Sequence, residues 1–243
     1  MTQPSHRPAA EASPGQEPGP RQRHREATTA GILERARVQL AEHGPAGLSL
    51  RKIARDMDLV SSAVYRYFPS RDDLLTRLII DGYHEYGQAV EDAEAGVERS
   101  AFAERFRAAA GALRAWALAN PNTYALIYGS PVPGYHAPQD TIAAASRAGL
   151  VLIRVLEDAA QSGHVFPVDG ESAPPGETVA GLAEQLGSKL APSVLAPAVD
   201  SWSHLMGLIS FETFGQYRNM IADTDRFYSA AVSGALARFD LRD

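Results

Sequence analysis

Two short helical patterns on either side of a tight turn occupy residues 50–68. Ile53 and Met57 lie four positions apart and therefore share a face of the first helix, while Val64 and Tyr67 lie three apart on the second. These side chains can form a small shared core between the two helices. The pattern is that of a helix-turn-helix.

The turn between the two short helices is predicted at Asp58. This position calls for a positive φ, which Asp tolerates better than most residues other than Gly. Ala54 stands where the two helices would cross most closely, so its small side chain lets them approach. Ser49 is placed to N-cap the first helix, and Val60 or Ser61 opens the second.

A long amphipathic helix is predicted directly after this motif, from Arg71 to about Ala95. Ser70 is its predicted N-cap, and Asp73 supplies the reciprocal carboxylate of a capping-box variant. The apolar side consists of Leu74, Leu75, Leu78, Ile79, Tyr83, Tyr86 and Val90. At 1.5 Å per residue, roughly 25 residues span about 37 Å, so this helix can join the motif to a separate body.

The same periodicity predicts helices over the rest of the chain, so the expected fold class is all-α. The predicted helices cover about residues 27–43, 102–117, 121–128, 139–161, 197–217 and 223–239, with loops at 129–135 and 162–176. The helix at 197–217 is apolar around most of its circumference. This indicates that one side packs on the body and the other on a partner subunit.

Composition narrows the class of protein. The chain has 243 residues, 45% of them apolar, and no cysteine, which excludes disulfides and Cys-based zinc sites. The first 25 residues are Pro-rich and polar, so we expect a disordered tail. Its basic end, residues 21–25, is either an arm that contacts DNA or a solvated tail. With no long apolar run, we expect no membrane span and no secretory signal, and a cytoplasmic location.

The net charge of −6 is unevenly distributed along the chain. Residues 21–71 hold ten Lys or Arg and five Asp or Glu, a net charge of +5, which leaves −11 for the remainder. A basic segment that coincides with the helix-turn-helix, attached to an acidic body, would orient the protein on a polyanion. The alternative explanation is an ordinary scatter of surface charge.

The segment from Val60 to Leu75 resembles the DNA-binding signature of the TetR/AcrR family of transcriptional regulators. The resemblance is strong over residues 28–80. It departs from the family at Asp58, where Gly is usual, and at Arg71, where many members have Lys. The resemblance implies a homodimeric repressor that binds an inverted-repeat operator in double-stranded DNA and is relieved by a small ligand.

The implied organisation is a tail at 1–25, a three-helix DNA-binding domain at 26–72 and a helical ligand-binding and dimerisation domain at 73–243. The residues assigned to DNA contact are Arg51, Ser61, Ser62, Ala63, Tyr65, Arg66, Tyr67 and Arg71. Arg51 and Arg71 are expected on phosphates, and the residues of the second short helix in the major groove. Tyr67 is equally well explained as a core aromatic residue.

Two further sites are predicted in the body. A small apolar or aromatic effector is expected beside Tyr83, Tyr86, Phe102, Phe106, Trp116, Tyr124, Tyr128 and His204, although such aromatic stripes are also typical of packed core. The dimer interface is expected at Trp202, Met206, Ile209, Tyr228, Ala231 and Ala235. Residues 202–207 also resemble the Trp-His-Gly signature of one TetR C-terminal subgroup, with Met206 in place of its His.

No constellation of catalytic residues is found in the sequence, so we expect no enzyme activity, no cofactor and no metal site. Asp200, Ser201 and His204 have the residue types of a hydrolytic triad, but neighbours on a helix point in different directions. The alternative function is an all-helical ligand-binding protein or enzyme whose N-terminal motif is only structural. Duplex DNA binding at low salt would distinguish the two, because only the regulator requires it.

Overall fold

The computed structural model describes residues 19–167 and 179–241, and the regular elements in these ranges are helical. In chain order they are α1 (Pro20–His43), the 3₁₀ turn η1 (Pro45–Gly47), α2 (Leu50–Asp56), α3 (Ser61–Tyr65), α4 (Arg71–Ala95), α5 (Phe102–Ala119), α6 (Pro121–Tyr128), α7 (Thr141–Gln161), α8 (Ala180–Leu186), α9 (Pro192–Thr213) and α10 (Thr224–Arg238). The all-α fold class is confirmed. No helix in the described ranges is both long and apolar enough to cross a membrane.

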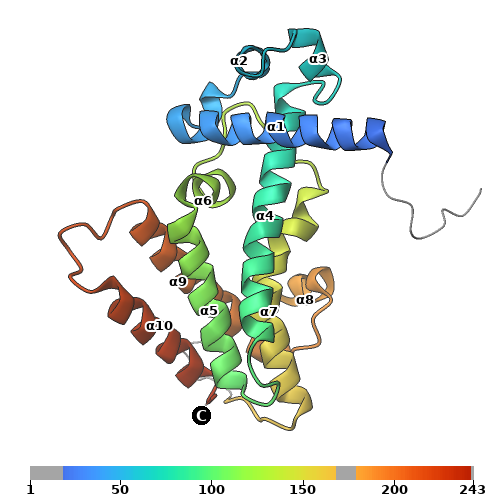
Figure 1. The fold of residues 1–243 in the computed structure, drawn as a ribbon. Coiled ribbons are helices and arrows are strands. Elements are labelled where there is room, and N and C mark those ends of the chain that lie inside the picture. The colour runs from blue at the N-terminus through green and yellow to red at the C-terminus, as the bar shows by residue number, and fades with distance from the viewer. Residues whose placement is uncertain (1–18, 168–178, 242–243) are drawn as a thin grey trace, which may run out of the picture.

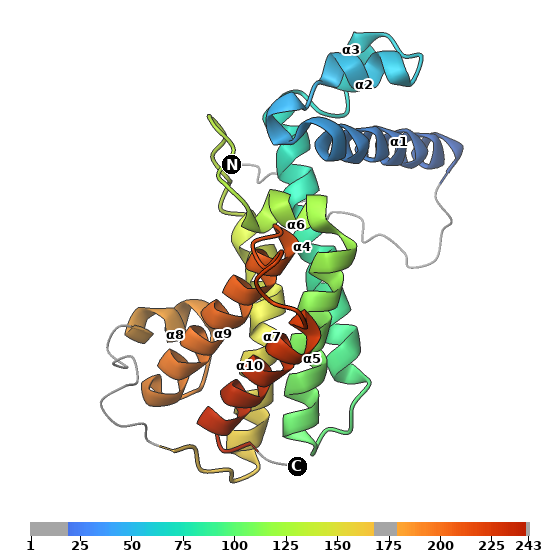
Figure 2. The ribbon, with the colours of Figure 1, turned by 90° about the vertical axis from the view of Figure 1, so that its left-hand side faces the viewer.

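The molecule has a small head and a larger helical body joined by α4. Figure 1 shows α1, α2 and α3 at one end, with α4 running from them into the body. Figure 2 shows α8 and α9 on one side of α7, and α4 and α5 on the other. In the head, Ile32, Ile53 and Val64 come from three different helices and are fully buried together. The head core therefore depends on all three helices.

The long helix α4 has the predicted bounds and the predicted cap. The Ser70 hydroxyl accepts the backbone N–H of Asp73 at 3.1 Å and donates to its carboxylate at 2.7 Å. A Cβ added at Gly82 would lie 2.8 Å from Thr123 of α6, and one added at Gly87 would lie 2.7 Å from Arg147 of α7. The two glycines therefore let α4 pack closely on α6 and α7.

The first helix begins earlier than predicted. It starts at Pro20 rather than near Ala27, with Gly19 as N-cap. Proline is favoured at the first helical position because its fixed φ suits a helix and its missing N–H has no partner there. The Gln22 side chain also bonds Glu26 one turn later at 3.0 Å. Residues 20–25 are thus helical, which corrects their assignment to a disordered tail; residues 1–18 of that tail lie outside the described ranges.

The region of α8 and α9 also differs from the prediction. Helix α8 was not predicted, and α9 begins at Pro192, so that Pro197 lies inside it. Both prolines have the signature of a helix start, and periodicity alone does not choose between them. Helix α9 ends at Thr213 rather than Tyr217, because Gly215 has φ 75° and the Gln216 N–H bonds the Phe211 carbonyl at 2.7 Å. Gly215 therefore terminates the helix.

Candidate nucleic-acid interface and ligand pocket

The turn between α2 and α3 contains the predicted left-handed residue. Asp58 has φ 54°, and the N–H groups of Asp58 and Leu59 donate to the carbonyls of Arg55 (3.1 Å) and Ala54 (2.8 Å). This pair of bonds is the Schellman motif, which usually has Gly at its left-handed position. Ala54 is completely buried, as the predicted close crossing requires. The geometry of the helix-turn-helix is therefore as predicted.

Helix α3 buries one face against the head core, and its other face is exposed to solvent. Val64 is completely buried and fixes the helix, whereas Ser61, Ser62, Tyr65 and Arg66 are exposed. Hydroxyl and guanidinium groups are the side-chain types that hydrogen-bond to base edges in the major groove. The outward face of α3 thus combines these groups on a helix whose orientation is set by its buried side.

Two predicted DNA contacts, Ala63 and Tyr67, are half-buried. The Tyr67 ring packs against the head core, and the Arg25 guanidinium lies 5.8 Å from its ring centre. Tyr67 is therefore a half-buried aromatic residue that packs against the head core, one of the two roles considered for it. Because Arg25 belongs to α1, this contact also brings the start of α1 to the end of α3.

Arg51 and Arg71, the two residues predicted to contact phosphates, have different surroundings in the structure. Arg51 is exposed at the start of α2. The Arg71 guanidinium instead donates to the Pro45 carbonyl at 2.7 Å, which ties η1 to the start of α4. Arg21 and Arg25 of α1 line a shallow groove with Arg66. Residues 21–25 were predicted to be either an arm that contacts DNA or a solvated tail. They instead form the start of helix α1, which places Arg21 and Arg25 beside Arg66.

Comparison with known proteins agrees with this geometry. Residues 32–78 match "Bacterial regulatory proteins, tetR family", and residues 106–235 match "Tetracyclin repressor-like, C-terminal domain". The chain belongs to the TetR family. The HTH-type transcriptional regulators Rv1816 of Mycobacterium tuberculosis and Mb1846 of Mycobacterium bovis are each 38% identical to it over 215 residues, 87% of this chain and 92% of each relative. The crystal structure of SCO4313, described as a regulatory protein, has a TM-score of 0.74 at 35% identity and covers 90% of this chain and 100% of its own.

Membership of the TetR family identifies the chain as a DNA-binding transcriptional regulator, from a family that is not enzymatic. The function class inferred from the helix-turn-helix is therefore confirmed. The C-terminal match is to the tetracyclin repressor-like description. The Trp-His-Gly subgroup stays a prediction that rests on residues 202–207.

The aromatic residues predicted to bind an effector mostly pack on one another in this TetR-family body. The Tyr86 ring centre lies 4.9 Å from that of Trp116, 5.6 Å from Tyr128 and 6.2 Å from Tyr124. Tyr83 joins them, 5.7 Å from Tyr128. Burial raises the pKa of both the Tyr86 and the Tyr128 hydroxyl well above the ordinary value. Tyr86, Trp116, Tyr124 and Tyr128 therefore pack as core, whereas Tyr83 at the edge of the cluster also lines a second hollow beneath the loop before α7.

Most hydroxyl groups of the cluster are already bonded within the chain. Tyr83 donates to the Ile127 carbonyl at 2.9 Å, and Tyr124 bonds Ser210 at 2.9 Å. The Tyr128 hydroxyl is buried with no partner among the described residues. The polar tips therefore do not require a ligand, apart from this one hydroxyl.

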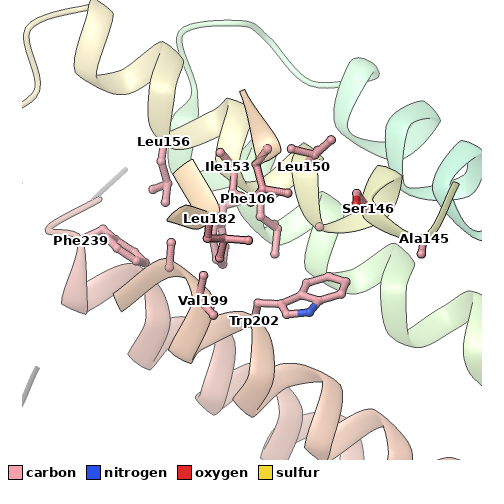
Figure 3. Close-up of a pocket in the computed structure, with 14 residues that line it drawn as sticks. Phe106, Ala145, Ser146, Leu150, Ile153, Leu156, Leu182, Val199, Trp202 and Phe239 are labelled. Atoms are coloured by element: carbon pink, nitrogen blue, oxygen red, sulfur yellow. The ribbon is translucent and has the colours of Figure 1, made fainter. Parts of the chain in front are cut away.

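The remaining predicted effector residues lie elsewhere. Phe102 stacks near the Arg105 guanidinium at the start of α5, and His204 is exposed on α9. Phe106, by contrast, lines a cavity of about 200 Å³ between α7, α8 and α9 (Figure 3). Its lining consists of Phe106, Ala145, Ser146, Gly149, Leu150, Leu152, Ile153, Leu156, Leu182, Leu186, Ala198, Val199, Trp202 and Phe239. Of the eight predicted residues, Phe106 alone lines this cavity. The position of the cavity depends on α8, a helix that the sequence did not indicate.

The residues predicted to form the dimer interface face the body instead. Met206, Ile209, Tyr228 and Ala235 are buried within the chain, and the Tyr228 hydroxyl donates to the Ala110 carbonyl of α5 at 2.9 Å. The other two are half-buried: Trp202 lines the cavity, and Ala231 packs against the core. An all-round apolar pattern does not show which side of a helix meets the body, and four of the six predicted positions lie on the side that does.

Ion pairs tie the helices of the body together. At the far end of α4, Glu94 is bonded by the buried Arg105 (2.5 Å) and the exposed Arg99 (2.6 Å), and both arginines also reach Asp158 of α7. A further Arg, Arg147 of α7, makes a two-pronged contact to Glu91 of α4 at 3.0 and 2.6 Å. These contacts fix α4 to α7 at two levels.

A comparable contact joins α5 to α9. The Arg114 guanidinium bonds both oxygens of Glu212 at 2.6 Å. Hydrogen bonding to Arg114 holds the pKa of Glu212 below its ordinary value of 4.5. The end of α9 is therefore attached to the body electrostatically as well as by packing.

Proposed function

We propose that this TetR-family regulator is a repressor that binds an inverted-repeat operator as a homodimer and is released by a small ligand. The observation that carries the DNA-binding part is the exposed face of α3, where Ser61, Ser62, Tyr65 and Arg66 point away from a helix anchored by Val64. Specific contacts come from α3. Arg51 and the α1 arginines supply phosphate contacts, which act on any sequence.

The exposed sides of α9 and α10 support the dimer. Phe211, Phe214 and Phe227 are 55%, 43% and 42% exposed near the connection between the two helices. The Tyr217 ring lies between those of Phe211 and Phe227, with ring centres 5.8 and 5.7 Å away, so Phe211, Tyr217 and Phe227 form one apolar patch. Contiguous exposed apolar patches on soluble proteins mark interaction sites.

Small exposed residues continue from this patch along both helices. On α9 these are Ser203 and Gly207, one turn apart in line with Phe211, and on α10 they are Ala230 and Gly234. Small side chains let two helices approach closely. The proposed interface is therefore the outer face of α9 and α10, packed on the same face of a second copy about a two-fold axis.

Such a dimer sets two α3 helices side by side on DNA. Recognition helices of a two-fold dimer read half-sites about one helical turn, roughly 34–36 Å, or a little more apart. The operator is then an inverted repeat. A ligand that prefers a body conformation with a different spacing lowers operator affinity, and a coupling of roughly 1–3 kcal/mol corresponds to about 5- to 150-fold.

The test of DNA binding begins with selection of genomic fragments that the protein retains at low salt. Arg51→Ala should weaken binding to selected and random duplexes alike and reduce the slope of log K against log salt by about 1. Arg66→Ala should weaken binding to the selected fragments by roughly 1–3 kcal/mol and should change binding to random duplexes little. Equal losses on both kinds of DNA for Arg66→Ala would remove α3 from base readout.

The test of the dimer uses one substitution on the proposed face and one away from it. Gly207→Arg places a charge on the outer face of α9 and should convert the dimer to a monomer in light scattering at micromolar concentration. Ala160→Arg adds the same charge at an exposed position of α7 and should leave the dimer intact. A wild-type protein that is monomeric in this assay would contradict the proposal.

A further inference from the structure

The cavity between α7, α8 and α9 is separate from the aromatic cluster in which the sequence placed the effector. We propose that this cavity is the effector site and that its ligand is an uncharged apolar molecule of one or two rings. The inference rests on the proposed ligand-relieved repressor, and it adds the location of the site and the chemical class of the ligand. Figure 3 shows Trp202 and Val199 on the α9 side of the cavity and Leu150 and Ile153 on the α7 side.

The lining determines the charge of the ligand. None of the described residues that line the cavity is ionisable, and the polar groups among them are the Ser146 hydroxyl and the Trp202 indole N–H. The Ser146 hydroxyl already donates to the Ile142 carbonyl at 2.9 Å. A carboxylate or an ammonium group would lose its hydration here without gaining an opposite charge, at a large cost in free energy. The site therefore selects neutral ligands.

The volume determines the size of the ligand. An engineered apolar cavity of about 150 Å³ in another protein stays dry and binds benzene. The cavity in this protein, at about 200 Å³ and lined almost wholly by Leu, Ile, Val, Ala and aromatic side chains, is somewhat larger. A substituted benzene or a fused pair of rings fits this space, and water has few partners in it.

Small residues on opposite walls create the space. Gly149 of α7 faces the Trp202 ring of α9, and a Cβ added at Gly149 would lie 3.7 Å from that ring, an ordinary contact distance. Ala198 lies one turn before Trp202 on α9 and also lines the cavity. A larger side chain at either position would occupy part of the cavity, so the site can be tested by filling it.

Helix α7 connects the cavity to the DNA-binding head. Arg147, next to the lining residue Ser146, holds Glu91 and Gln88 of α4, the latter at 2.6 Å. A second hollow under the loop before α7 shares Ser146 with the cavity, and Tyr135 of that loop bonds Thr76 of α4 at 2.9 Å. A ligand that separates α7 from α9 therefore acts on α4 both in its last third, at Gln88 and Glu91, and close to its start in the head, at Thr76.

The experiment uses naphthalene as the neutral two-ring probe and 2-naphthoate as its charged counterpart. Binding is followed on the full-length protein by calorimetry and by thermal unfolding in circular dichroism. Naphthalene near a hundred times its Kd should raise Tm by roughly 5–10 °C, and 2-naphthoate should have no effect. Naphthalene should also lower affinity for a selected genomic fragment by about 5- to 150-fold.

Two filling variants and one control locate the site. Gly149→Leu and Ala198→Leu should each abolish naphthalene binding while keeping a native circular dichroism spectrum and cooperative melt. Gly111→Leu makes the same change on α5, where no described residue outside the local helix backbone lies within 4 Å of the added Cβ, and this variant should bind naphthalene as wild type does. Having two filling variants on different helices keeps the test decisive if one of them fails to fold.

Several results would overturn the inference. Wild-type protein that does not bind naphthalene, or that binds 2-naphthoate equally well, would contradict the proposed ligand class. Undiminished naphthalene binding by a folded filling variant would contradict the proposed location. Naphthalene binding with unchanged DNA affinity would remove the effector role. The binding arm contains no DNA, so failure of the proposed regulator would show as absent DNA binding with naphthalene binding retained.

Discussion

The arginine pair at the far end of α4 allows the effect of burial on an ion pair to be measured on the same two carboxylates, although Arg105 also donates to the Arg99 carbonyl at 2.9 Å. Arg105 and Arg99 both bond Glu94, at 2.5 and 2.6 Å, and both bond Asp158, at 2.6 and 2.7 Å. Their side chains differ in exposure, 1% for Arg105 and 60% for Arg99. We therefore compare Arg105→Met with Arg99→Met.

The two substitutions should differ severalfold in their cost. Removing one member of a buried ion pair leaves an unpaired charge and typically costs about 3–5 kcal/mol. Because Arg99 still contacts Glu94 in the Arg105→Met variant, we expect the low end of that range, about 3 kcal/mol. An exposed pair contributes about 0.2–1 kcal/mol, so Arg99→Met should cost less than about 1 kcal/mol.

The assay is urea unfolding followed by circular dichroism at one fixed protein concentration, since dimerisation makes apparent stability depend on concentration. A double variant, Glu94→Gln with Arg105→Met, should recover part of the loss because it removes a carboxylate that has lost its buried partner and keeps only the exposed Arg99. Equal losses for Arg105→Met and Arg99→Met would refute the assignment of the effect to burial. So would a loss below about 1 kcal/mol for Arg105→Met.

Three other perturbations test the body and the turn. Tyr128→Phe removes a buried hydroxyl without a partner among the described residues and should raise the free energy of unfolding by about 1 kcal/mol. Tyr124→Phe breaks a 2.9 Å hydrogen bond to a serine of α9 and should lower the free energy of unfolding by about 1 kcal/mol. Equal shifts for the two variants would contradict this assignment. Because the pKa of Glu212 beside Arg114 is lowered, this carboxylate stabilises the fold at pH values above its ordinary pKa of 4.5. That contribution is lost as the pH falls through the lower pKa of the folded state. Glu212→Gln should therefore flatten the acid loss of stability in urea titrations below about pH 4.5, and an unchanged profile would count against it. Asp58→Gly should stabilise the head by up to about 1 kcal/mol in thermal unfolding, because Gly has no left-handed penalty, and a loss of stability would show that the Asp side chain has a role of its own.

Local signals predicted the head and the long helix well. The start of α4 follows from Ser70 and Asp73, whose capping bonds involve residues only three apart. The positive φ of Asp58 follows from its place between two short periodic segments. In both cases the determining interactions lie within a few residues of each other, so the sequence contains them directly.

The predictions that failed depend on tertiary packing or on ambiguous signals. Pro192 and Pro197 both have the signature of a helix start, and the structure uses the first. The inward face of α9, with Ile209, is chosen by contact with α5 and α7 and not by any asymmetry of its own apolar pattern. The cavity depends on where the short α8 lies against Trp202, a relation between distant segments that periodicity does not contain.

The small outward face of α3 has a consequence for the information content of the operator. It carries one guanidinium, from Arg66, and otherwise the hydroxyls of Ser61, Ser62 and Tyr65. A bidentate Arg contact discriminates against a wrong base by about 1–3 kcal/mol, roughly 5- to 150-fold. A genome presents on the order of 10⁶–10⁹ competing sites, so one such half-site occurs far too often to define a single operator.

In the proposed dimer two half-sites must occur together at one spacing and in opposite orientation. Much of the specificity for the operator then lies in its symmetry and in the distance between its halves. A change of a few ångströms in the distance between the two heads would therefore abolish that specificity, although each head would still recognise the same bases.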